Sequence, residues 1–562
     1  MTAPIRASDY VNCIGVVAQL GAVGGPAKAQ AVLDAFSYLG LHNVRTPLTG
    51  ALVQAGSVAD KLAQAGFHFD VLVGPGRPLA DTLGLASAFA KAHPGAIAAL
   101  EGPNEINNWP MTYSGLSGVD AAVSFVGALA AGARADPLLA GASLYDFTGA
   151  MRSAATMRDA SEFTNIHPYP QAGAQPFEWI RARITTHAVP GKGIVITETG
   201  YSTTLGTANS SAVDLPTQAK MTLNLVADAT LLGVSKTYLY QLFDYGKAGS
   251  ADAGFGLFDS VLQPKPAAVA IHNLTSILAD PGAEAAGFTP HALDYTLMGM
   301  PPGAHSLLIE KSNGTYELMI WAEPQVWDAA KGQPVSASGS AVTVTLAGGP
   351  GELRLFDPLL SAQPQAVGHD ARTMTVMVSD HPVIIEIAGI ALGTSVAPAR
   401  FDPPMLLAGT GAVDVFGGGN GDDVLAGLGG ADTIDGGAGN DRLNGGVGAD
   451  MLTGGAGADT FVFQTVGDSR LASGERDTIR DFSAAQQDRL DMSMIDANAA
   501  NVGNQAFQLA GDRFGRHAGE LIQTVSSEGV LVQGDQNGDG RADFAIMLAG
   551  NTHALGAECF VL

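Results

Sequence analysis

The sequence predicts a multidomain protein that begins with a (β/α)8 barrel, continues with a β-sandwich and ends in a parallel β-roll. Three observations predict this order: eight alternations of short β-rich runs and amphipathic helical stretches, then alternating apolar strands between turn residues, then a nine-residue repeat. With 562 residues, the chain is longer than the about 250 to 300 residues at which a single core stops growing. Several domains are therefore expected.

The barrel is expected over residues 1–282. Its predicted strands are 11–18, 43–46, 67–73, 97–102, 138–142, 163–167, 193–197 and 236–241. The helices predicted between and after them are 26–39, 57–65, 80–92, 118–134, 149–158, 175–186, 214–232 and 265–277. Eight βα units over this length are typical of a TIM barrel. A doubly wound sheet is the alternative, but the glycine fingerprint of dinucleotide binding does not follow the first strand.

Two glutamates follow barrel strands at their carboxyl ends, where the chemistry of such barrels takes place. Glu105 comes behind Asn104 after the fourth strand, and Glu198 comes directly after the seventh. Three βα units separate the two glutamates, which places their carboxylates on opposite sides of one barrel mouth. Glycosidic cleavage needs such a pair, because one carboxylic acid protonates the leaving oxygen and one carboxylate attacks the anomeric carbon.

An Asn-Glu pair after strand four and a Glu after strand seven resemble clan A of the retaining glycoside hydrolases, and NEINNWP (104–110) is similar to family 39 or its neighbours. The resemblance spans about 280 residues. It implies that Glu105 is the acid/base, that Glu198 is the nucleophile and that Asn104 bonds the sugar 2-hydroxyl. It implies a carbohydrate substrate and no cofactor for catalysis.

Further substrate-binding residues follow from the same resemblance. Arg45 ends strand two, where an arginine commonly supports the nucleophile, and IHPYP places His167 and Tyr169 after strand six. Trp109 either lines a sugar subsite or caps the long loop after strand four. Many clan members carry a Trp after strand eight, where this chain has the substrate-binding candidates Tyr240 and Gln241. Three other acids are expected to be structural or peripheral: Glu101, Asp70 and Asp244.

Residues 283–391 alternate apolar and polar positions between Gly, Pro, Asn and Asp turns, which predicts a β-sandwich. A rigid structural appendage is favoured over a carbohydrate-binding module, an alternative that remains open. A proline-containing linker is expected over residues 392–407.

A nine-residue repeat dominates residues 408–463, with glycine opening each copy and aspartate at its sixth position. The six aspartates are Asp414, Asp423, Asp432, Asp441, Asp450 and Asp459. Glycines allow a tight turn whose carbonyls converge, and the carboxylate completes an oxygen cage that suits Ca²⁺. An apolar eighth residue then starts a strand that stacks on its neighbours, which predicts a solenoid. A flexible glycine-rich linker would not keep these positions in phase.

This pattern resembles the RTX repeats of secreted bacterial proteins, which form a calcium-filled parallel β-roll. Residues 464–562 look like the C-terminal region of RTX proteases and other type I secretion substrates, and the last residues, ECFVL, resemble the uncleaved export signal of that pathway. The resemblance implies the type I secretion apparatus as a partner, an extracellular location and no cleaved N-terminal signal. Four oxygen-bearing residues form either a further calcium site or a solvated turn: Asp535, Asn537, Asp539 and Asp543.

Charge excludes several other classes of protein. The chain carries 29 basic and 54 acidic residues, a net charge of −25, which disfavours nucleic acid and anionic membranes as partners. The small-apolar run 121–133 is shorter than the roughly 18 residues of a membrane span. We therefore expect a secreted retaining hydrolase of β-glycosidic bonds in a poly- or oligosaccharide, an exopolysaccharide among the options. The alternative is a non-catalytic adhesin or lectin exported by its RTX tail.

Overall fold

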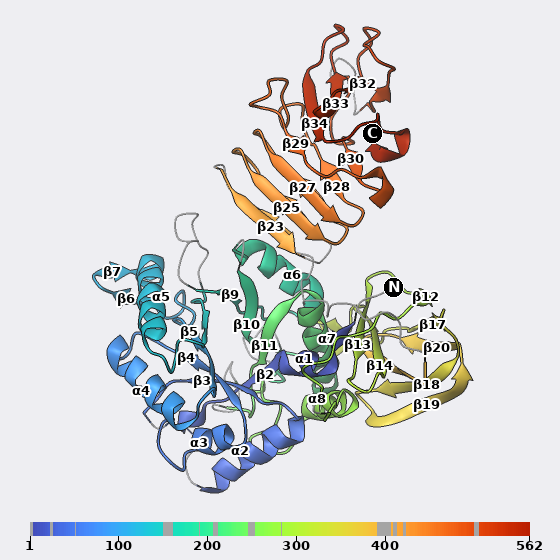
Figure 1. The fold of residues 1–562 in the computed structure, drawn as a ribbon. Helices are drawn as coiled ribbons and strands as arrows, with labels where there is room; N and C mark the ends of the chain where they lie inside the picture. The colour runs from blue at the N-terminus through green and yellow to red at the C-terminus, as the bar shows by residue number, and fades with distance from the viewer. Residues whose placement is uncertain are drawn as a thin grey trace. The chain divides into compact units, whose positions relative to one another are not determined.

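The computed structural model describes residues 4–22, 26–50, 52–149, 161–189, 192–205, 212–245, 253–282, 284–390, 406–408, 413–419, 423–498 and 505–562 (Figure 1). The chain divides into two compact units. The first comprises Met1–His187 and Lys192–Phe401, and the second comprises Ala188–Gly191 and Asp402–Leu562.

Eight parallel strands in the first unit close into a barrel, which confirms the predicted TIM barrel. Each strand pairs with the next one along the chain, and the last pairs with the first. In chain order the strands are β2 (Ile14–Val17), β3 (Asn43–Pro47), β4 (His68–Leu72), β5 (Ile97–Glu101), β8 (Ser143–Tyr145), β9 (Phe163–Ile166), β10 (Gly193–Thr199) and β11 (Val234–Leu239). The carboxyl ends of all eight therefore meet at one mouth.

Helices flank the barrel as the 3.6-residue periodicity predicts (Figure 1). They are α2 (Pro26–Leu39), α3 (Val58–Gln64), α4 (Leu79–Ala92), α5 (Gly118–Ala135), α6 (Pro176–His187), α7 (Leu215–Leu231) and α8 (Pro266–Ile277). Polar caps fix two of the helix starts: Ser57 accepts from the amide of Asp60 at 3.0 Å, and Asp214 accepts from that of Thr217 at 2.9 Å. The helix predicted at 149–158 falls, apart from Gly149, outside the described residues.

Two strand predictions need correction. The first strand begins late because Ala7–Asn12 form a helix, α1, that buries Tyr10. The fifth strand is Ser143–Tyr145, not 138–142. The amide of Leu139 bonds the Asp136 carbonyl at 3.0 Å and that of Ala142 bonds the Leu139 carbonyl at 2.9 Å, so 138–142 is a series of turns. Leu139 and Ala142 are apolar because they are buried beneath these turns, and burial alone does not make a strand.

Helix α5 is the one described helix that is long and apolar enough to cross a membrane by length and composition, with 18 residues and a mean hydropathy of 1.2. Its apolar face is buried in the barrel core through Phe125, Val126 and Leu129. The expectation that this segment is shorter than a membrane span is therefore wrong for its length, and the helix packs as an element of the barrel ring.

Two further sheets cover the range for which a β-sandwich is predicted. The first contains β1 (Ile5–Arg6), β13 (Ala304–Glu310), β14 (Tyr316–Ala322), β21 (Val383–Ala388), β18 (Gly351–Asp357) and β19 (Ser361–Ala371). The second contains β12 (Tyr295–Met298), β17 (Ser340–Leu346) and β20 (Thr373–Val378). Both contribute to one buried cluster. Because β1 pairs with β13, the start of the chain belongs to this sheet, although the predicted boundary at 282 assigns it to the barrel.

The second unit contains two ladders that are parallel over the repeats, and the second of them continues into antiparallel pairs (Figure 1). One ladder is β22 (Leu406–Ala408), β24 (Val424–Ala426), β26 (Arg442–Asn444), β28 (Thr460–Val462), β30 (Arg489–Asp491) and β35 (Phe560–Val561). The other begins with β23 (Val415–Gly419), β25 (Thr433–Ala438), β27 (Met451–Ala456) and β29 (Thr478–Ile479), and continues through β34 (Phe544–Ala549), β33 (Gly529–Asp535), β32 (Glu520–Val525) and β31 (Gln508–Leu509). In the antiparallel pairs, β33 lies between β34 and β32.

Two nonapeptides make one turn of the roll, because strands pair at a spacing of two repeats: Leu425 with Leu443, and Ile434 with Leu452. These four apolar eighth positions are fully buried. β22 begins within the predicted linker 392–407, so the linker ends before Leu406; residues 392–405 lie outside the described ones.

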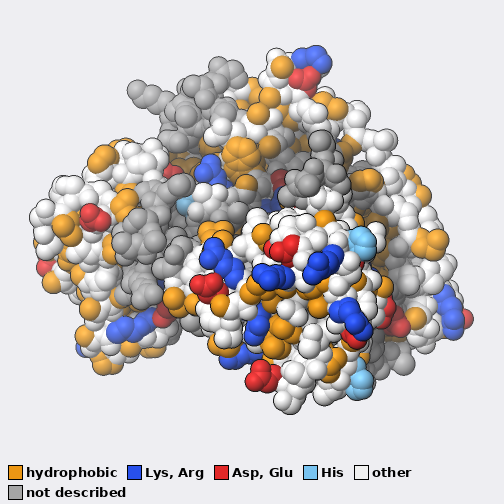
Figure 2. Space-filling model, turned by 90° about the horizontal axis from the view of Figure 1, so that it is seen from above, with side chains coloured by type: hydrophobic (Ala, Val, Ile, Leu, Met, Phe, Trp, Pro, Cys, Tyr) orange, Lys and Arg blue, Asp and Glu red, His pale blue; other side chains and the backbone are white. Residues whose placement is uncertain are grey.

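Charged side chains of both signs lie among singly spread hydrophobic ones on the face shown in Figure 2. Asp and Glu do not dominate this face, although they outnumber Lys and Arg by 54 to 29. Some of the acids are interior: five of the six repeat aspartates are no more than 1% exposed, namely Asp423, Asp432, Asp441, Asp450 and Asp459.

Candidate functional site

Glu105 stands in the loop after β5, in a backbone conformation that its neighbours hold. Its φ of 42° lies in the left-handed region, which is uncommon for a residue with a side chain. Its amide donates to Thr148 Oγ1 at 2.8 Å, and its carbonyl accepts from the amides of Asn108 and Trp109, both at 2.8 Å. Gly149 lies against it, since a Cβ there would be 2.7 Å from the Glu105 Cα. Such strained residues cluster at functional sites.

Arg45, on β3, connects the side chains of the second, fourth and seventh barrel strands. Its Nε and Nη2 donate to the two carboxylate oxygens of Glu101 at 2.6 and 2.7 Å. Its Nη1 donates to Glu198 Oε1, and Nη2 also donates to Asn104 Oδ1 at 3.0 Å. Because Arg45 is 2% exposed and Glu101 is 0% exposed, this forked pair is rigid and fixes where the guanidinium meets Glu198.

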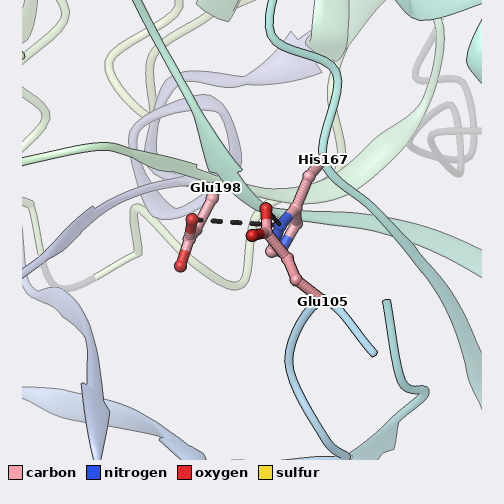
Figure 3. A group of neighbouring side chains, drawn as sticks. All are labelled: Glu105, His167 and Glu198. Carbon is pink, nitrogen blue, oxygen red and sulfur yellow. Dashed lines mark hydrogen bonds and ion pairs between the residues drawn. The ribbon is translucent and has the colours of Figure 1, made fainter. Parts of the chain in front are cut away.

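Glu105, His167 and Glu198 point toward one another across the mouth (Figure 3). One carboxylate oxygen of each glutamate and one ring nitrogen of His167 all lie within 4.8 Å of one another. His167 Nδ1 is 3.2 Å from Glu105 Oε1 and 3.9 Å from Glu198 Oε2. The hydroxyl of Tyr169 donates to Glu198 Oε2 at 3.0 Å, so both oxygens of Glu198 are held.

The surroundings of Glu105 favour its ionised form in the ligand-free site. The hydrogen bond from His167 lowers the pKa of Glu105 most, and the Asn108 amide, which donates to Oε2 at 2.9 Å, lowers it further. Burial opposes them by raising that pKa. Burial also keeps Tyr169 a hydroxyl donor, since it raises the Tyr169 pKa well above its ordinary value.

A second layer of polar side chains lies beneath the mouth. Thr197 Oγ1 is 2.9 Å from His167 Nε2 and 3.0 Å from Glu101 Oε1, and Asn165 Nδ2 donates to the same Glu101 oxygen at 3.0 Å. Asp70 is fully buried on β4, where burial first and the Glu101 charge second raise its pKa well above the ordinary range. This layer positions Arg45 and His167 and does not itself reach the mouth.

Cavities surround the carboxylates at the mouth. One of about 330 Å³ is lined by Glu105, His167 and Arg183, and one of about 500 Å³ is lined by Asn104, Arg77 and Trp109. The Trp109 side chain is 72% exposed, so its ring is open to solvent and does not cap the loop.

A third cavity at the mouth, of about 200 Å³, is lined by residues that follow β2 and β11, Gln241 among them. The Nε2 of Gln241 is buried without a hydrogen-bond acceptor among the described residues. Tyr240 packs edge-to-face on Tyr169 at 6.3 Å and on Phe255 at 5.6 Å.

The trio Glu105, His167 and Glu198 has the residue types of a metal site, but its charges do not favour a cation. Arg45 already places a positive group on Glu198, and Tyr169 directs a proton at the other oxygen. A metal ion bound there would face the guanidinium across a single carboxylate. The arrangement suits proton transfer and nucleophilic attack better than coordination.

The repeat aspartates of the roll form two ladders, in which each carboxylate accepts from the backbone amide of an aspartate in a neighbouring turn. One ladder runs Asp414, Asp432, Asp450, Asp477 and the other runs Asp423, Asp441, Asp459, Asp488. These bonds use only one oxygen of each side chain. The Oδ2 atoms of four ladder members are buried without a donor among the described residues: Asp432, Asp450, Asp459 and Asp477.

The space around these oxygens fits a bare cation. A Cβ at Gly445 or Gly454 would stand 2.3 or 2.4 Å from the Oδ2 of Asp450 or Asp459, so only glycine leaves the carboxylate room there. Burial raises the pKa of Asp450 and Asp459 to about 6 and that of Asp477 to about 9. Buried oxygens that lack a positive partner are the donor set of Ca²⁺, which the ladder residues would hold between turns.

The turn between β33 and β34 is different. Asp535 accepts from the amides of Gly538 at 2.7 Å and Gly540 at 2.8 Å, and Asp543 accepts from that of Gln536 at 2.7 Å. Asn537 and Asp539 likewise accept from amides two residues ahead. The geometry is that of a hydrogen-bonded turn, one of the two interpretations left open by the sequence.

Sequence reasoning missed three residues that the structure places in these sites. Glu101, expected to be structural or peripheral, holds Arg45 and so takes part in the site; the signal was its inward phase on the strand that ends at Glu101. Asp477 and Asp488 extend the aspartate ladders beyond the six regular copies. Their signal was the Asp-x-apolar spacing in DTI and DRL, which persists after the nine-residue period breaks.

A comparison with protein-family models finds a match within the second unit. Residues 410–561 match the family model described as the peptidase M10 serralysin C terminal. No curated protein matches the chain.

Among solved structures, a family 39 glycoside hydrolase from Bacteroides cellulosilyticus WH2 is 14% identical, covers 68% of this chain and 82% of its own, and has a TM-score of 0.45. A monomeric β-xylosidase from Caulobacter crescentus CB15 is 14% identical, covers 69% and 98%, and also scores 0.45. The AlgE6R3 subunit of a mannuronan C5-epimerase from Azotobacter vinelandii is 34% identical over 27% of this chain and 80% of its own, with a TM-score of 0.21. The matched range 410–561 covers the repeats and the C-terminal region in which the sequence resembles RTX proteases.

Proposed function

We propose that the chain is a secreted retaining glycoside hydrolase that cleaves β-glycosidic bonds of a poly- or oligosaccharide, with Glu198 as nucleophile and Glu105 as acid/base. The observation that carries this proposal is the close approach of two carboxylates, with Glu105, His167 and Glu198 contributing atoms within 4.8 Å of one another. Retaining enzymes need carboxyl groups about 5 to 5.5 Å apart, whereas inverting enzymes hold them about 6.5 to 9.5 Å apart to admit a water molecule.

In the first step, Glu198 attacks the anomeric carbon while Glu105 gives its proton to the glycosidic oxygen. The bond between the anomeric carbon and that oxygen breaks, and an ester forms between Glu198 and the sugar. Arg45 and Tyr169 hold one Glu198 oxygen each, so the carboxylate does not rotate between approach and attack.

In the second step, the ionised Glu105 takes a proton from water, whose oxygen attacks the anomeric carbon and displaces Glu198. His167 suits this step, because its hydrogen bond to Glu105 favours the ionised form. Asn104, held by Arg45 at 3.0 Å, is placed to bond the sugar 2-hydroxyl.

Three further side chains support binding of a sugar chain at the mouth. The exposed ring of Trp109 offers a flat apolar platform, and the buried Nε2 of Gln241 offers a donor that lacks a partner within the described protein. Tyr240, at the end of the eighth strand, packs its ring against the rings of Tyr169 and Phe255.

Export and calcium complete the proposal. The match of residues 410–561 to a serralysin C-terminal region supports type I secretion, and the partnerless buried oxygens of the aspartate ladders support Ca²⁺ as a structural ion. Extracellular calcium modules bind with dissociation constants of about 0.1 to 1 mM, so the roll is expected to fill only outside the cell.

The test is a panel of neutral and acidic polysaccharides incubated with the purified full chain in calcium, with product sizes measured. Wild type is expected to release oligosaccharides from at least one polymer, and Glu198→Gln and Glu105→Gln each to lose at least about 100-fold in kcat with unchanged circular dichroism. Glu178→Gln, the same change at an exposed acid on α6 that lines none of the three cavities, is the control. Sugar binding without hydrolysis by wild type would favour the adhesin or lectin alternative.

A further inference from the structure

A second group of ionisable side chains lies where barrel helix α7 meets the six-stranded sheet. Asp228 belongs to α7, His305 belongs to β13, and Glu323 directly follows β14. One oxygen of each carboxyl group and one ring nitrogen of His305 lie within 4.8 Å of one another. None of the three lines the cavities of the barrel mouth.

The charges of this group are not balanced by the protein that surrounds it. Asp228 is 0% exposed; its Oδ1 accepts from Trp321 Nε1 at 2.8 Å, while its Oδ2 is buried without a donor among the described residues. Glu323 accepts a long bond of 3.4 Å from the Phe177 amide, and its carboxyl group lies within hydrogen-bond reach of that of Asp228. Within the described ranges, neither acid forms an ion pair with lysine or arginine. Two neighbouring carboxyl groups in this position need either a shared proton or a cation.

His305 is held beside the two carboxyl groups by aromatic rings. Its ring stacks on Phe177 at 4.2 Å and 26° and lies 5.6 Å from the Trp321 ring. One of its ring nitrogens lies within 4.8 Å of an oxygen of each carboxyl group, and the nitrogen of a neutral histidine ring is a common metal ligand.

We infer that Asp228, His305 and Glu323 bind one divalent transition-metal cation of the Zn²⁺ kind, which ties helix α7 to strands β13 and β14. The buried, partnerless Oδ2 of Asp228 is the observation that points to a ligand there. The ion would neutralise both acids and use the imidazole nitrogen as its third protein ligand.

The donor set selects the class of ion. An imidazole nitrogen with two carboxylates suits Zn²⁺, while Ca²⁺ takes six to eight oxygens. Donors at about 2.0 to 2.2 Å from a tetrahedral ion lie about 3.3 to 3.6 Å apart, so atoms now within 4.8 Å need to close by little more than 1 Å. With three protein ligands, a water molecule would complete the tetrahedron.

The test measures Zn²⁺ on the full chain in a buffer that holds millimolar Ca²⁺, so that the aspartate ladders are filled with calcium. Mass spectrometry of the metal after dialysis against micromolar Zn²⁺ is expected to find one equivalent in wild type. Replacement by Co²⁺ is expected to give visible absorption bands of tetrahedral coordination. The competing explanation, a proton shared by Asp228 and Glu323, predicts no bound equivalent and would overturn the inference.

Variants locate the ion. His305→Gln is expected to weaken Zn²⁺ binding by at least about 100-fold, more than a change outside the ligand shell would. His291→Gln, the same substitution where the ring bonds Glu310 at 2.9 Å, is expected to keep the equivalent. Glu198→Gln separates this site from the barrel mouth and is also expected to keep it. Loss of the equivalent in Glu198→Gln, or its retention in His305→Gln, would contradict the assignment.

Discussion

The barrel mouth and the β-roll both gather carboxylates, but they balance the negative charge in opposite ways. At the mouth, Arg45 and Tyr169 each hold one oxygen of Glu198, and His167 bonds Glu105. In the roll, Asp450 accepts the backbone amide of Asp432 on one oxygen, and its Oδ2 has no donor among the described residues. Carboxylates supported by the protein are ready to react, whereas carboxylates left without support need an ion.

Removal of calcium is expected to have the largest effect, because it should unfold the roll and leave the barrel folded. A calcium-selective chelator is expected to abolish the β-structure of the roll at neutral pH while the barrel keeps its circular dichroism and its cooperative melting, because calcium is expected only in the aspartate ladders. Calorimetry of the full chain with and without chelator measures it. A single transition that shifts as a whole, or no shift at all, would contradict the separation.

The pH dependence of the calcium-free roll tests whether its buried carboxylates lack a positive partner. Burial raises the pKa of Asp450 and Asp459 to about 6 and that of Asp477 to about 9, so the folded chain binds these protons more tightly than the unfolded chain does. Stability from this source is full at acidic pH and is lost as the pH rises through these values. Without calcium, the roll should therefore keep part of its β-structure at pH 5 and lose it at pH 8; with saturating calcium, the roll should instead be more stable at pH 8, where the ladder carboxylates are ionised.

Loss of Glu101 is expected to damage the mouth next most severely. Glu101→Gln leaves the Arg45 guanidinium buried without its forked partner, and breaking a buried pair in this way costs about 3 to 5 kcal/mol. We also expect kcat to fall by about 100-fold, because Arg45 no longer fixes Glu198. Denaturant unfolding and kinetics measure the two effects. Asp70→Asn, at a neighbouring buried acid whose pKa is raised, should change both far less.

A methyl group beside Glu105 is expected to have an intermediate effect. In Gly149→Ala the new Cβ would meet the Glu105 Cα at 2.7 Å, and displacement of the acid/base by a fraction of an ångström should lower kcat by about 10- to 100-fold. Gly115→Ala is the matched control: its φ of 82° resembles the 90° of Gly149, but its Cβ would enter open space. Equal losses in both variants would show backbone strain instead of displacement.

The smallest expected effect is a shift of the pH profile. Because the His167 hydrogen bond lowers the pKa of Glu105, His167→Gln should raise that pKa. The acid role of Glu105 needs its proton, so the alkaline limb of kcat/KM should move to higher pH. If the alkaline limb of kcat/KM stays at the same pH while activity falls, His167 acts only through packing.

Much of this arrangement was predictable from sequence because it depends on local periodicity. Hydrophobic patterns of period two and 3.6 indicate the strand ends that carry Glu105 and Glu198. The nine-residue repeat indicates the six regularly spaced aspartates. The fifth strand was misplaced because the apolar residues Leu139 and Ala142 are buried in turns.

Residues that act through contacts distant in sequence were harder to predict. The Glu101–Arg45 pair joins residues 56 positions apart in the sequence. The hydrogen bond that the Asp450 amide donates to Asp477 joins residues 27 positions apart, and Asp477 lies beyond the regular nine-residue repeat. The group of Asp228, His305 and Glu323 arises only from packing of a barrel helix against a sheet. No spacing in the chain indicates it.

The most direct measurement concerns the bond that Glu198 is proposed to form. A 2-deoxy-2-fluoro glycoside with a good leaving group, built on the sugar that the polysaccharide panel identifies, slows release of the covalent intermediate. Mass spectrometry of peptides from the treated full chain is expected to find one sugar added on Glu198, and none in Glu198→Gln. An adduct on another residue, or turnover of natural substrate with inverted anomeric configuration, would contradict Glu198 as the nucleophile.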